Sequence, residues 1–204
     1  MYLPDAFRQD DPATLHAAMA AAGLAILVTL GADGLAASHV PLLLDPDPAP
    51  LGTLRGHLAK PNPQGRGAQG DALVIFTGPD GYITPSWYET KRRTGAVVPT
   101  WNYVAIHATG PITFFADTER LRAIVTRLTE RHEAPRAAPW AVSDAPAAYI
   151  EGMLKGIVGF EIPISRLEGK WKLSQNRPAE DRAGVVAGLT ETGQTALAAL
   201  VRDV

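Results

Sequence analysis

The sequence contains no cysteine, so disulfide bonds, thiolate metal sites and cysteine nucleophiles are excluded. Its histidines show no metal-ligand spacing, because His39, His57 and His107 fall on separate expected strands. A G-x-S-x-G elbow and a P-loop are also missing, and the acidic residues fall mostly in turns and at helix starts. We therefore expect no metal and no hydrolytic machinery, so that a bound cofactor would have to supply any reactivity.

An excess of charge and a long apolar run are also missing. The 204 residues carry 19 Lys and Arg against 21 Asp and Glu, whereas a dedicated nucleic-acid binder is usually basic. DNA contact would therefore depend on a local patch, for which Lys91, Arg92 and Arg93 are the candidates. No apolar run approaches the roughly 18 to 20 residues of a membrane span, and the start lacks a signal-peptide pattern. We expect a cytoplasmic protein without a membrane segment.

Aromatic residues are concentrated in one stretch, residues 78–110, which begins with the turn-like run GPDG. This stretch contains Tyr82, Trp87, Tyr88, Trp101 and Tyr103. Such side chains commonly pack in strand cores. The prolines and polar residues between them are also typical of irregular segments that form sites. Core packing and a wall for a flat ligand both remain open.

Hydrophobic periodicity predicts an α+β chain. We expect helices at 11–23, 117–132 and 144–156, and one broken or two short helices after 178. Strands are expected at 24–30, 35–45, 53–59, 72–77, 101–115, 158–164 and 168–173, and loops at 45–52, 65–70 and 89–95. About six or seven mainly antiparallel strands result, and the bend near Gly110 and Pro111 favours a barrel. We expect one domain over 1–204, with a C-terminal helical extension from about 178.

The run GRGAQG at 65–70 formally matches the dinucleotide-binding pattern G-x-G-x-x-G. That pattern binds a pyrophosphate only where it links a strand to the start of a helix. Here the run precedes a strand, so we interpret it as a flexible loop.

Two segments combine cations with polar groups. Thr53, Arg55 and His57 share one face of a strand that leads to Lys60 and Asn62. This face is typical either of an anion site or of an exposed sheet surface.

The second such segment, residues 168–182, places Lys170 and Lys172 on one side of an extended run. The polar residues that follow crowd the start of a helix that Pro178 can begin. The same pattern fits a helix cap with solvated lysines.

Several runs resemble, in order, those of the PaiB-type FMN-binding negative transcriptional regulators. They include LAASHVPLLLD, GTLRGHLAKPNPQ, PSWY, VPTWNY, PWAVSDAPAAYIEGML and KWKLSQN, and the likeness spans nearly the whole chain. The resemblance implies a flavin-binding split β-barrel, similar to pyridoxamine phosphate oxidases, that forms a homodimer with FMN at the interface. It implies a negative transcriptional regulator; the alternative is an FMN-dependent oxidoreductase acting on a small molecule. No helix-turn-helix with a basic recognition helix is evident.

The resemblance also implies which residues bind the cofactor. By analogy, Ser38, His39 and Val40 would border the isoalloxazine ring, and His57 and Lys60 would lie near the ribityl phosphate. Asn102 would lie near a ring or ribityl oxygen, and the pocket would be closed by Lys172, Gln175 and Arg177. The run GRGAQG departs from the family, in which an aromatic residue often follows Asn62 and Pro63 closely.

Overall fold

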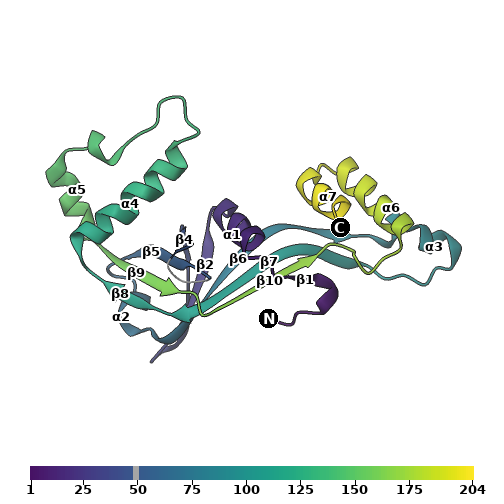
Figure 1. The fold of residues 1–204 in the computed structure, drawn as a ribbon, viewed down its shortest axis with the longest axis horizontal. Helices are drawn as coiled ribbons and strands as arrows, with labels where there is room; N and C mark the ends of the chain where they lie inside the picture. Colours follow the sequence, from purple (N-terminus) through teal and green to yellow (C-terminus); the bar gives the residue numbers. More distant parts are fainter. Residues whose placement is uncertain (48–50) are drawn as a thin grey trace. The chain divides into compact units, whose positions relative to one another are not determined.

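The computed structural model describes residues 1–47 and 51–204 (Figure 1). The strands are β1 (Arg8–Gln9), β2 (Ala25–Gly31), β3 (Gly34–Val40), β4 (Leu43–Asp45), β5 (Thr53–Ala59), β6 (Gln69–Ile83), β7 (Thr100–Pro111), β8 (Thr113–Phe115), β9 (Ile157–Pro163) and β10 (Arg166–Lys172). The α-helices are α1 (Pro12–Ala21), α2 (Gln64–Gly67), α3 (Glu89–Arg93), α4 (Thr118–Glu133), α5 (Ala147–Leu154), α6 (Ala179–Glu191) and α7 (Thr195–Arg202). The 3-10 turns are η1 (Asp5–Phe7), η2 (Pro85–Trp87) and η3 (Val142–Asp144).

The strands form two sheets. The six-stranded sheet has the order β1-β10-β7-β6-β2-β3, and the four-stranded sheet has the order β4-β5-β9-β8. The hairpin β2–β3 is antiparallel and closes at the Gly31–Gly34 pair, while β5 and β9 pair antiparallel from Thr53–Pro163 to Ala59–Ile157. The predicted α+β class is therefore confirmed. There are more strands than expected because the strand expected at 35–45 divides into β3 and β4, the one at 101–115 divides into β7 and β8, and the two-residue β1 carries no readable periodicity.

Aspartate side chains cap two of the expected helices. The Asp11 carboxylate accepts a hydrogen bond from Thr14 N at 2.9 Å at the start of α1. The Asp117 carboxylate accepts one from Arg120 N at 2.8 Å at the start of α4. Each cap satisfies a backbone donor that has no partner within its helix.

Three local predictions are wrong. The expected loops at 65–70 and 89–95 contain the short helices α2 and α3, and the turn-like run GPDG lies inside β6. The glycines of this run are needed because other side chains pack closely against the strand. A Cβ on Gly78 would lie 2.9 Å from the Val104 Cβ, and one on Gly81 would lie 2.9 Å from Leu197. Of the expected proline-rich loop at 45–52, residues 48–50 lie outside the described residues.

The predicted strand 101–115 bends as expected but divides into β7 and β8, which belong to different sheets. The bend follows from packing at Gly110, where a Cβ would lie 2.0 Å from the Pro163 carbonyl oxygen. Only a residue without a side chain fits at that point.

The chain divides into two compact units. The first unit comprises Met1–Leu15, Thr77–Ile106 and Glu168–Val204, and the second comprises His16–Phe76 and His107–Leu167.

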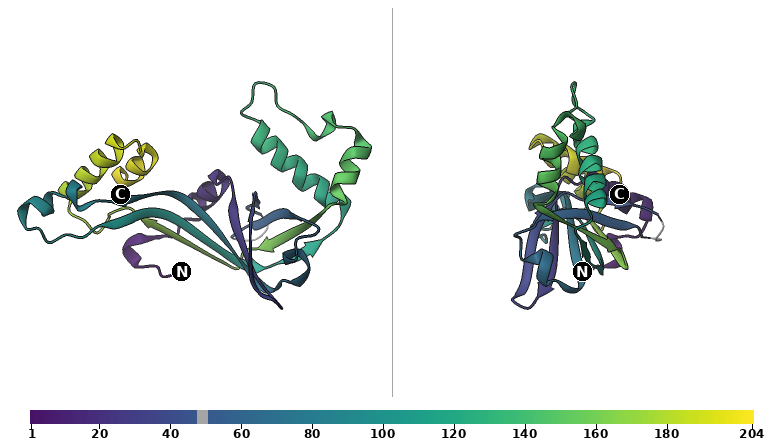
Figure 2. Two further views of the ribbon diagram at one scale, coloured as in Figure 1. Left: turned by 180° about the vertical axis from the view of Figure 1, so that it is seen from behind. Right: turned by 90° about the vertical axis from the view of Figure 1, so that its left-hand side faces the viewer.

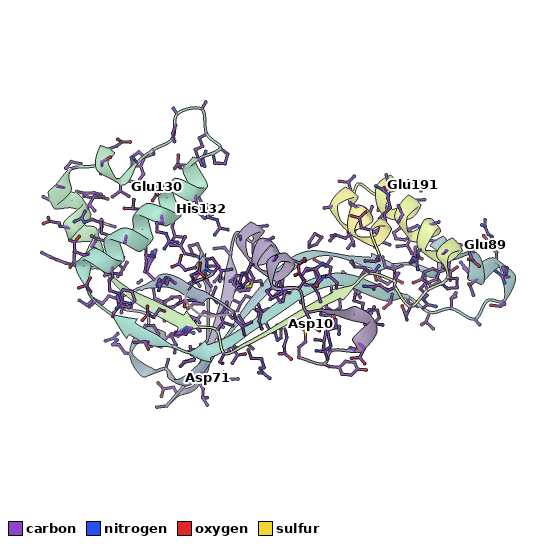
Figure 3. The ribbon with its side chains drawn as sticks, in the orientation of Figure 1. Asp10, Asp71, Glu89, Glu130, His132 and Glu191 are labelled. Carbon is purple, nitrogen blue, oxygen red and sulfur yellow. The ribbon has the colours of Figure 1, made fainter. Side chains whose placement is uncertain are left out.

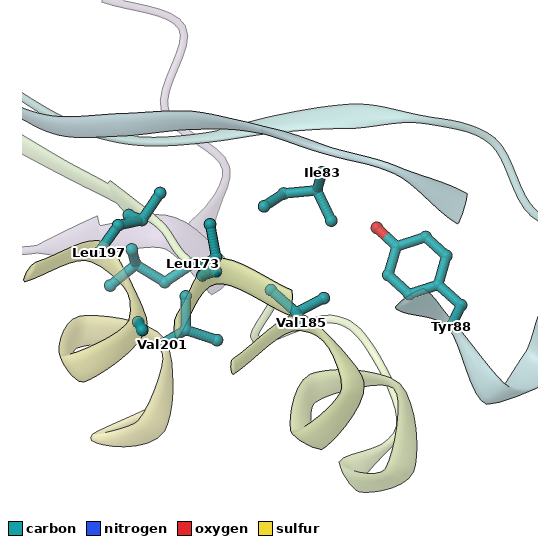
Figure 4. Close-up of a cluster of buried hydrophobic side chains, with 8 residues drawn as sticks. Ile83, Tyr88, Leu173, Val185, Leu197 and Val201 are labelled. Atoms are coloured by element: carbon teal, nitrogen blue, oxygen red, sulfur yellow. The ribbon is translucent and has the colours of Figure 1, made fainter. Parts of the chain in front are cut away.

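A buried hydrophobic cluster organises the first unit (Figure 4). It contains Ile83, Tyr88, Leu173, Val185, Leu189, Leu197, Ala198 and Val201. Helices α6 and α7 supply most of these side chains, and Trp87 packs against them. The aromatic stretch is thus partly core: Tyr88 is buried, whereas Tyr82 and Trp101 are 47% and 53% exposed.

Helix α6 meets Trp87 through two glycines, which gives a testable prediction. A Cβ on Gly188 would lie 2.2 Å from the Trp87 ring, and one on Gly184 would lie 1.9 Å from the Trp87 carbonyl oxygen. We expect Gly184→Ala and Gly188→Ala each to lower the free energy of unfolding by about 1–3 kcal/mol through overpacking. Chemical denaturation measures this, and Gly152→Ala, which has open space around it, is the control. Equal stability of all three variants would contradict the packing.

Ion pairs hold α4 to the four-stranded sheet of the second unit. Asp45 pairs with Arg55 and Arg127, and Glu161 pairs with Arg55 at 3.6 Å and with Arg120 at 2.8 Å. Arg55, which the sequence suggested for an anion site, is therefore already paired with carboxylates. The same strand face also carries His57.

Candidate functional site

A cavity of about 500 Å³ opens in the second unit between β3 and the end of β5. This volume is within the roughly 300–1,000 Å³ of ordinary small-molecule sites. Its lining includes Ser38, His39, Val40, His57 and Asn62. The structure thus brings four of the predicted cofactor residues to one cavity.

Asn62, which the sequence did not single out for cofactor binding, holds Ser38 in this cavity. Its Nδ2 donates a hydrogen bond to Ser38 Oγ at 3.0 Å, and its Oδ1 accepts one from Gln64 N at 3.0 Å. Gln64 is 3% exposed and donates to the carbonyl oxygens of Leu27 and Ala36 at 3.1 and 3.3 Å. The turn after β5 is therefore fastened to the β2–β3 hairpin, which fixes the Ser38 hydroxyl.

Lys60 lies directly after β5, between Ala59 and Asn62, which both line the cavity. Its backbone N–H donates to the Gly156 carbonyl oxygen at 2.8 Å, while its side chain is exposed. Among the described residues, no carboxylate pairs with its ammonium group. The charge is therefore available for an anion at this end of the strand.

His57 contributes a neutral ring to the cavity. Burial lowers the pKa of His57 below its ordinary value of 6.5, and its Nδ1 is buried without a hydrogen-bond partner. At neutral pH the imidazole therefore offers one N–H donor and one acceptor, and it brings no positive charge.

The lowered pKa of His57 predicts a pH-dependent stability. Between the folded-state pKa and about 6.5, the unfolded chain binds more protons than the folded protein. We expect the contribution of His57 to be complete above pH 6.5 and to be lost as the pH falls through that window. Denaturation at a series of pH values tests this, and His57→Gln should flatten the acid side of the profile. An unchanged acid slope in that variant would contradict the assignment.

In the first unit, Lys170 is an unexpectedly buried cation. It is 8% exposed, and its Nζ donates to the Tyr2 carbonyl oxygen at 3.1 Å. The same Nζ lies 5.4 Å from the Tyr2 ring centroid and 5.3 Å from that of Tyr103. Aromatic faces thus stabilise a charge that would otherwise be costly to bury.

Lys172 lies two residues further along β10, on the same strand face. Its Nζ donates to Thr100 Oγ1 and to the Trp101 carbonyl oxygen. Burial lowers the pKa of Lys172, and repulsion from Lys170 and Arg177 lowers it further. Within the described part of the chain, no carboxylate pairs with any of these three cations. A bound anion would relieve the repulsion, so the group has the electrostatics of an anion site.

The turn after β10 presents Arg177. Ser174 has a φ of 67°, and its hydroxyl hydrogen bonds with the Asn102 amide at 2.9 and 3.3 Å. Asn102 is fully buried, so this contact holds the strained residue in place. The Arg177 guanidinium lies 4.8 Å from the Tyr88 ring centroid and forms no ion pair with the described residues.

Gln175 fastens the same turn to its own backbone. Its Oε1 accepts a hydrogen bond from Leu173 N at 2.7 Å, and its Nε2 donates to the Trp171 carbonyl oxygen at 2.6 Å. The amides of Gln175 and Asn102 are therefore engaged inside the protein, where they shape the turn that carries Arg177. A direct flavin contact by either amide stays a prediction.

The predicted cofactor residues thus fall into two groups. The cavity group of the second unit consists of Ser38, His39, Val40 and His57, with Lys60 beside it. The turn group of the first unit consists of Asn102, Lys172, Gln175 and Arg177.

The candidate DNA patch is largely paired. Arg92 pairs with Glu89, Arg93 pairs with Glu180 at 3.0 Å, and Lys91 donates to Ser86 Oγ at 3.1 Å. Intramolecular carboxylates thus compensate two of its three charges. This weakens the case for the patch as a phosphate-binding surface.

Metal ligands and membrane helices are absent from the described ranges. No three His, Cys, Asp or Glu side chains gather there as metal ligands. In the same residues, no helix has the length and apolar character that a membrane crossing requires.

Comparison with solved structures defines the class. The chain is similar to the FAD and heme binding protein of Mycobacterium smegmatis, with a TM-score of 0.60 at 15% identity over 89% of this chain and 80% of that chain. Its fold class is the split β-barrel with peripheral helices.

Residues 1–166 match the family described as "Putative FMN-binding domain", and the chain belongs to that family. An uncharacterized protein of Aspergillus fumigatus is 40% identical over 202 residues, covering 78% of this chain and 77% of that protein. The protease synthase and sporulation protein PAI 2 of Bacillus subtilis is 37% identical over 138 residues, covering 67% and 64%. The PaiB-type resemblance is thereby confirmed.

Proposed function

We propose that this protein binds FMN and acts as a PaiB-type negative regulator of transcription, as a homodimer with FMN at the subunit interface. The observation that carries FMN binding is the group of Lys170, Lys172 and Arg177, three neighbouring cations without a carboxylate partner in the described residues. Family membership over residues 1–166 supports a flavin as the ligand. The cationic group lies beyond that match and supports the phosphate of FMN specifically.

The residues present fit such a cofactor. Arginine and lysine form charge-assisted hydrogen bonds with phosphate oxygens. The cavity beside His57 has an unpartnered ring nitrogen and a volume suited to a small molecule. We propose two sets of FMN contacts, each within its own unit: the cavity group with Lys60 beside it in the second unit, and the turn group with Lys172 and Arg177 in the first unit. The three cations are the candidate phosphate contacts. Bound FMN would supply one- and two-electron redox chemistry.

The regulatory role draws support from the Bacillus subtilis relative, which is named a protease synthase and sporulation protein. The paired charges of residues 91–93 favour contact with DNA through another surface or through a partner protein. A gel-shift titration with the DNA upstream of its own gene, at low salt and with and without FMN, tests direct repression. A shift that depends on FMN is expected, and the absence of any shift would remove the direct-repressor reading.

An oxidoreductase is the second candidate, favoured by an exposed aromatic pair. The rings of Tyr82 and Trp101 pack edge to face with centroids 6.1 Å apart, and both are about half exposed. Such a surface suits a flat substrate. Consumption of NADPH by the FMN-loaded protein with a small-molecule acceptor would favour the enzyme. No turnover with bound flavin would count against it.

A further inference from the structure

A second cavity lies in the second unit, away from the predicted cofactor residues. It has a volume of about 460 Å³, is open to solvent and is lined by residues of α4, η3 and α5 and of the segments beside them. Figures 1 and 2 show α4 and α5 side by side, joined by the segment that contains η3. The wall from η3 and α5 is mainly apolar and includes Val142 and Ile150, while the wall from α4 is polar. None of its lining residues lines the cavity beside His57.

The polar wall carries two opposite charges at fixed positions. Arg122, Thr126 and Glu130 follow one another at four-residue spacing, so they form one stripe along α4. A helix rises 1.5 Å per residue, which separates the Cα atoms of Arg122 and Glu130 by roughly 12 Å. At this separation Arg122 and Glu130 do not readily form an ion pair with each other. Glu130 is labelled on α4 in Figure 3.

Both charges lack partners in the described ranges, unlike other cations of the same helix. Arg120 pairs with Glu161, Arg127 pairs with Asp45, and Arg131 donates to backbone carbonyl oxygens. Neither Arg122 nor Glu130 forms a hydrogen bond or ion pair through its side chain among the described residues. Arg122 is only partly exposed, so water reaches its guanidinium group incompletely. An anion bound at this position would supply hydrogen bonds that water does not.

We propose that this cavity binds a small amphipathic zwitterion, which has a carboxylate at one end, an ammonium group at the other and an apolar body between them. The carboxylate lies at Arg122, the ammonium group lies at Glu130, and the apolar body packs on Val142 and Ile150. Charge complementarity selects this class, because a purely anionic ligand would meet Glu130 and a purely cationic ligand would meet Arg122. The site does not depend on FMN, so its failure leaves the cofactor proposal untouched.

The test uses three probes of equal chain length on the full-length protein. Binding of 8-aminooctanoate, octanoate and octylamine is measured by titration calorimetry and by protein-detected NMR. We expect 8-aminooctanoate to bind most tightly. Arg122→Gln should weaken 8-aminooctanoate about tenfold or more, as expected for the loss of a hydrogen bond to a charged group. In the Glu130→Gln variant, 8-aminooctanoate should bind no more tightly than octanoate, because the carboxylate that binds its ammonium group is gone.

The control variant is Glu191→Gln, on an exposed position of α6 in the first unit, which should change none of the affinities. Circular dichroism verifies that each variant is folded, and Glu130 provides an exposed position should Arg122→Gln unfold. Equal affinity for the three probes, no binding of any probe, or insensitivity to both substitutions would overturn the proposal. So would a change in sedimentation coefficient in Arg122→Gln without a change in probe binding, because that result would place a second copy of the chain over the cavity.

Discussion

Alanine at Lys60 or at Arg177 is expected to weaken FMN binding about tenfold to a hundredfold. Each substitution removes a cation that has no carboxylate partner in the described residues, and a hydrogen bond to a charged group contributes roughly 1.5–3 kcal/mol. Because Lys60 lies beside the cavity group and Arg177 belongs to the turn group, the two variants test the two units separately. Fluorescence titration of FMN measures both.

The loss should be specific for the phosphate. Riboflavin, which has the same ring and no phosphate, should bind the variants and the wild-type protein with similar affinity. Lys155→Ala, which removes an exposed lysine after α5, is the matched control and should retain the wild-type affinity for FMN. Unchanged FMN affinity in both site variants would show that the phosphate is placed wrongly.

Phe160→Ala is expected to lower the free energy of unfolding by about 3–5 kcal/mol. Phe160 is fully buried on β9, and its ring packs edge to face with Phe114 at 6.0 Å between centroids. It also fills the space over Gly56, where a Cβ would lie 2.7 Å from the ring. Truncation therefore removes apolar contacts and leaves a cavity that the sheet can close only in part.

Chemical denaturation measures this loss of stability. Leu24→Ala, which truncates a side chain that is 58% exposed, should change stability by less than about 0.5 kcal/mol. A Phe160→Ala variant as stable as Leu24→Ala would show that the four-stranded sheet is packed differently.

Local signals in the sequence determined the elements that were predicted correctly. Asp11 and Asp117 cap their helices within three residues of the groups they bind. The β2–β3 hairpin closes at a glycine turn between two apolar runs. The wrong predictions arose where long-range packing overrides local composition. The run GPDG has the composition of a turn, but it continues a strand because Val104 and Leu197 lie against its glycines.

In the candidate site, too, some residues could be predicted from the sequence and others could not. The resemblance implied that Ser38 and His57 bind the cofactor, and both residues line one cavity. The sequence could not show that Asn62 would hold Ser38, or that Tyr2 would cover a buried Lys170 from 168 residues away. Both contacts depend on which segments the fold brings together, which neither periodicity nor spacing encodes.

The most direct test is the visible absorbance of the purified protein after incubation with FMN and removal of free ligand by gel filtration, with riboflavin in a parallel sample. We expect FMN to elute with the folded protein in a fixed ratio and riboflavin to be retained at least about tenfold less well. Folded protein that retains neither flavin would contradict this expectation.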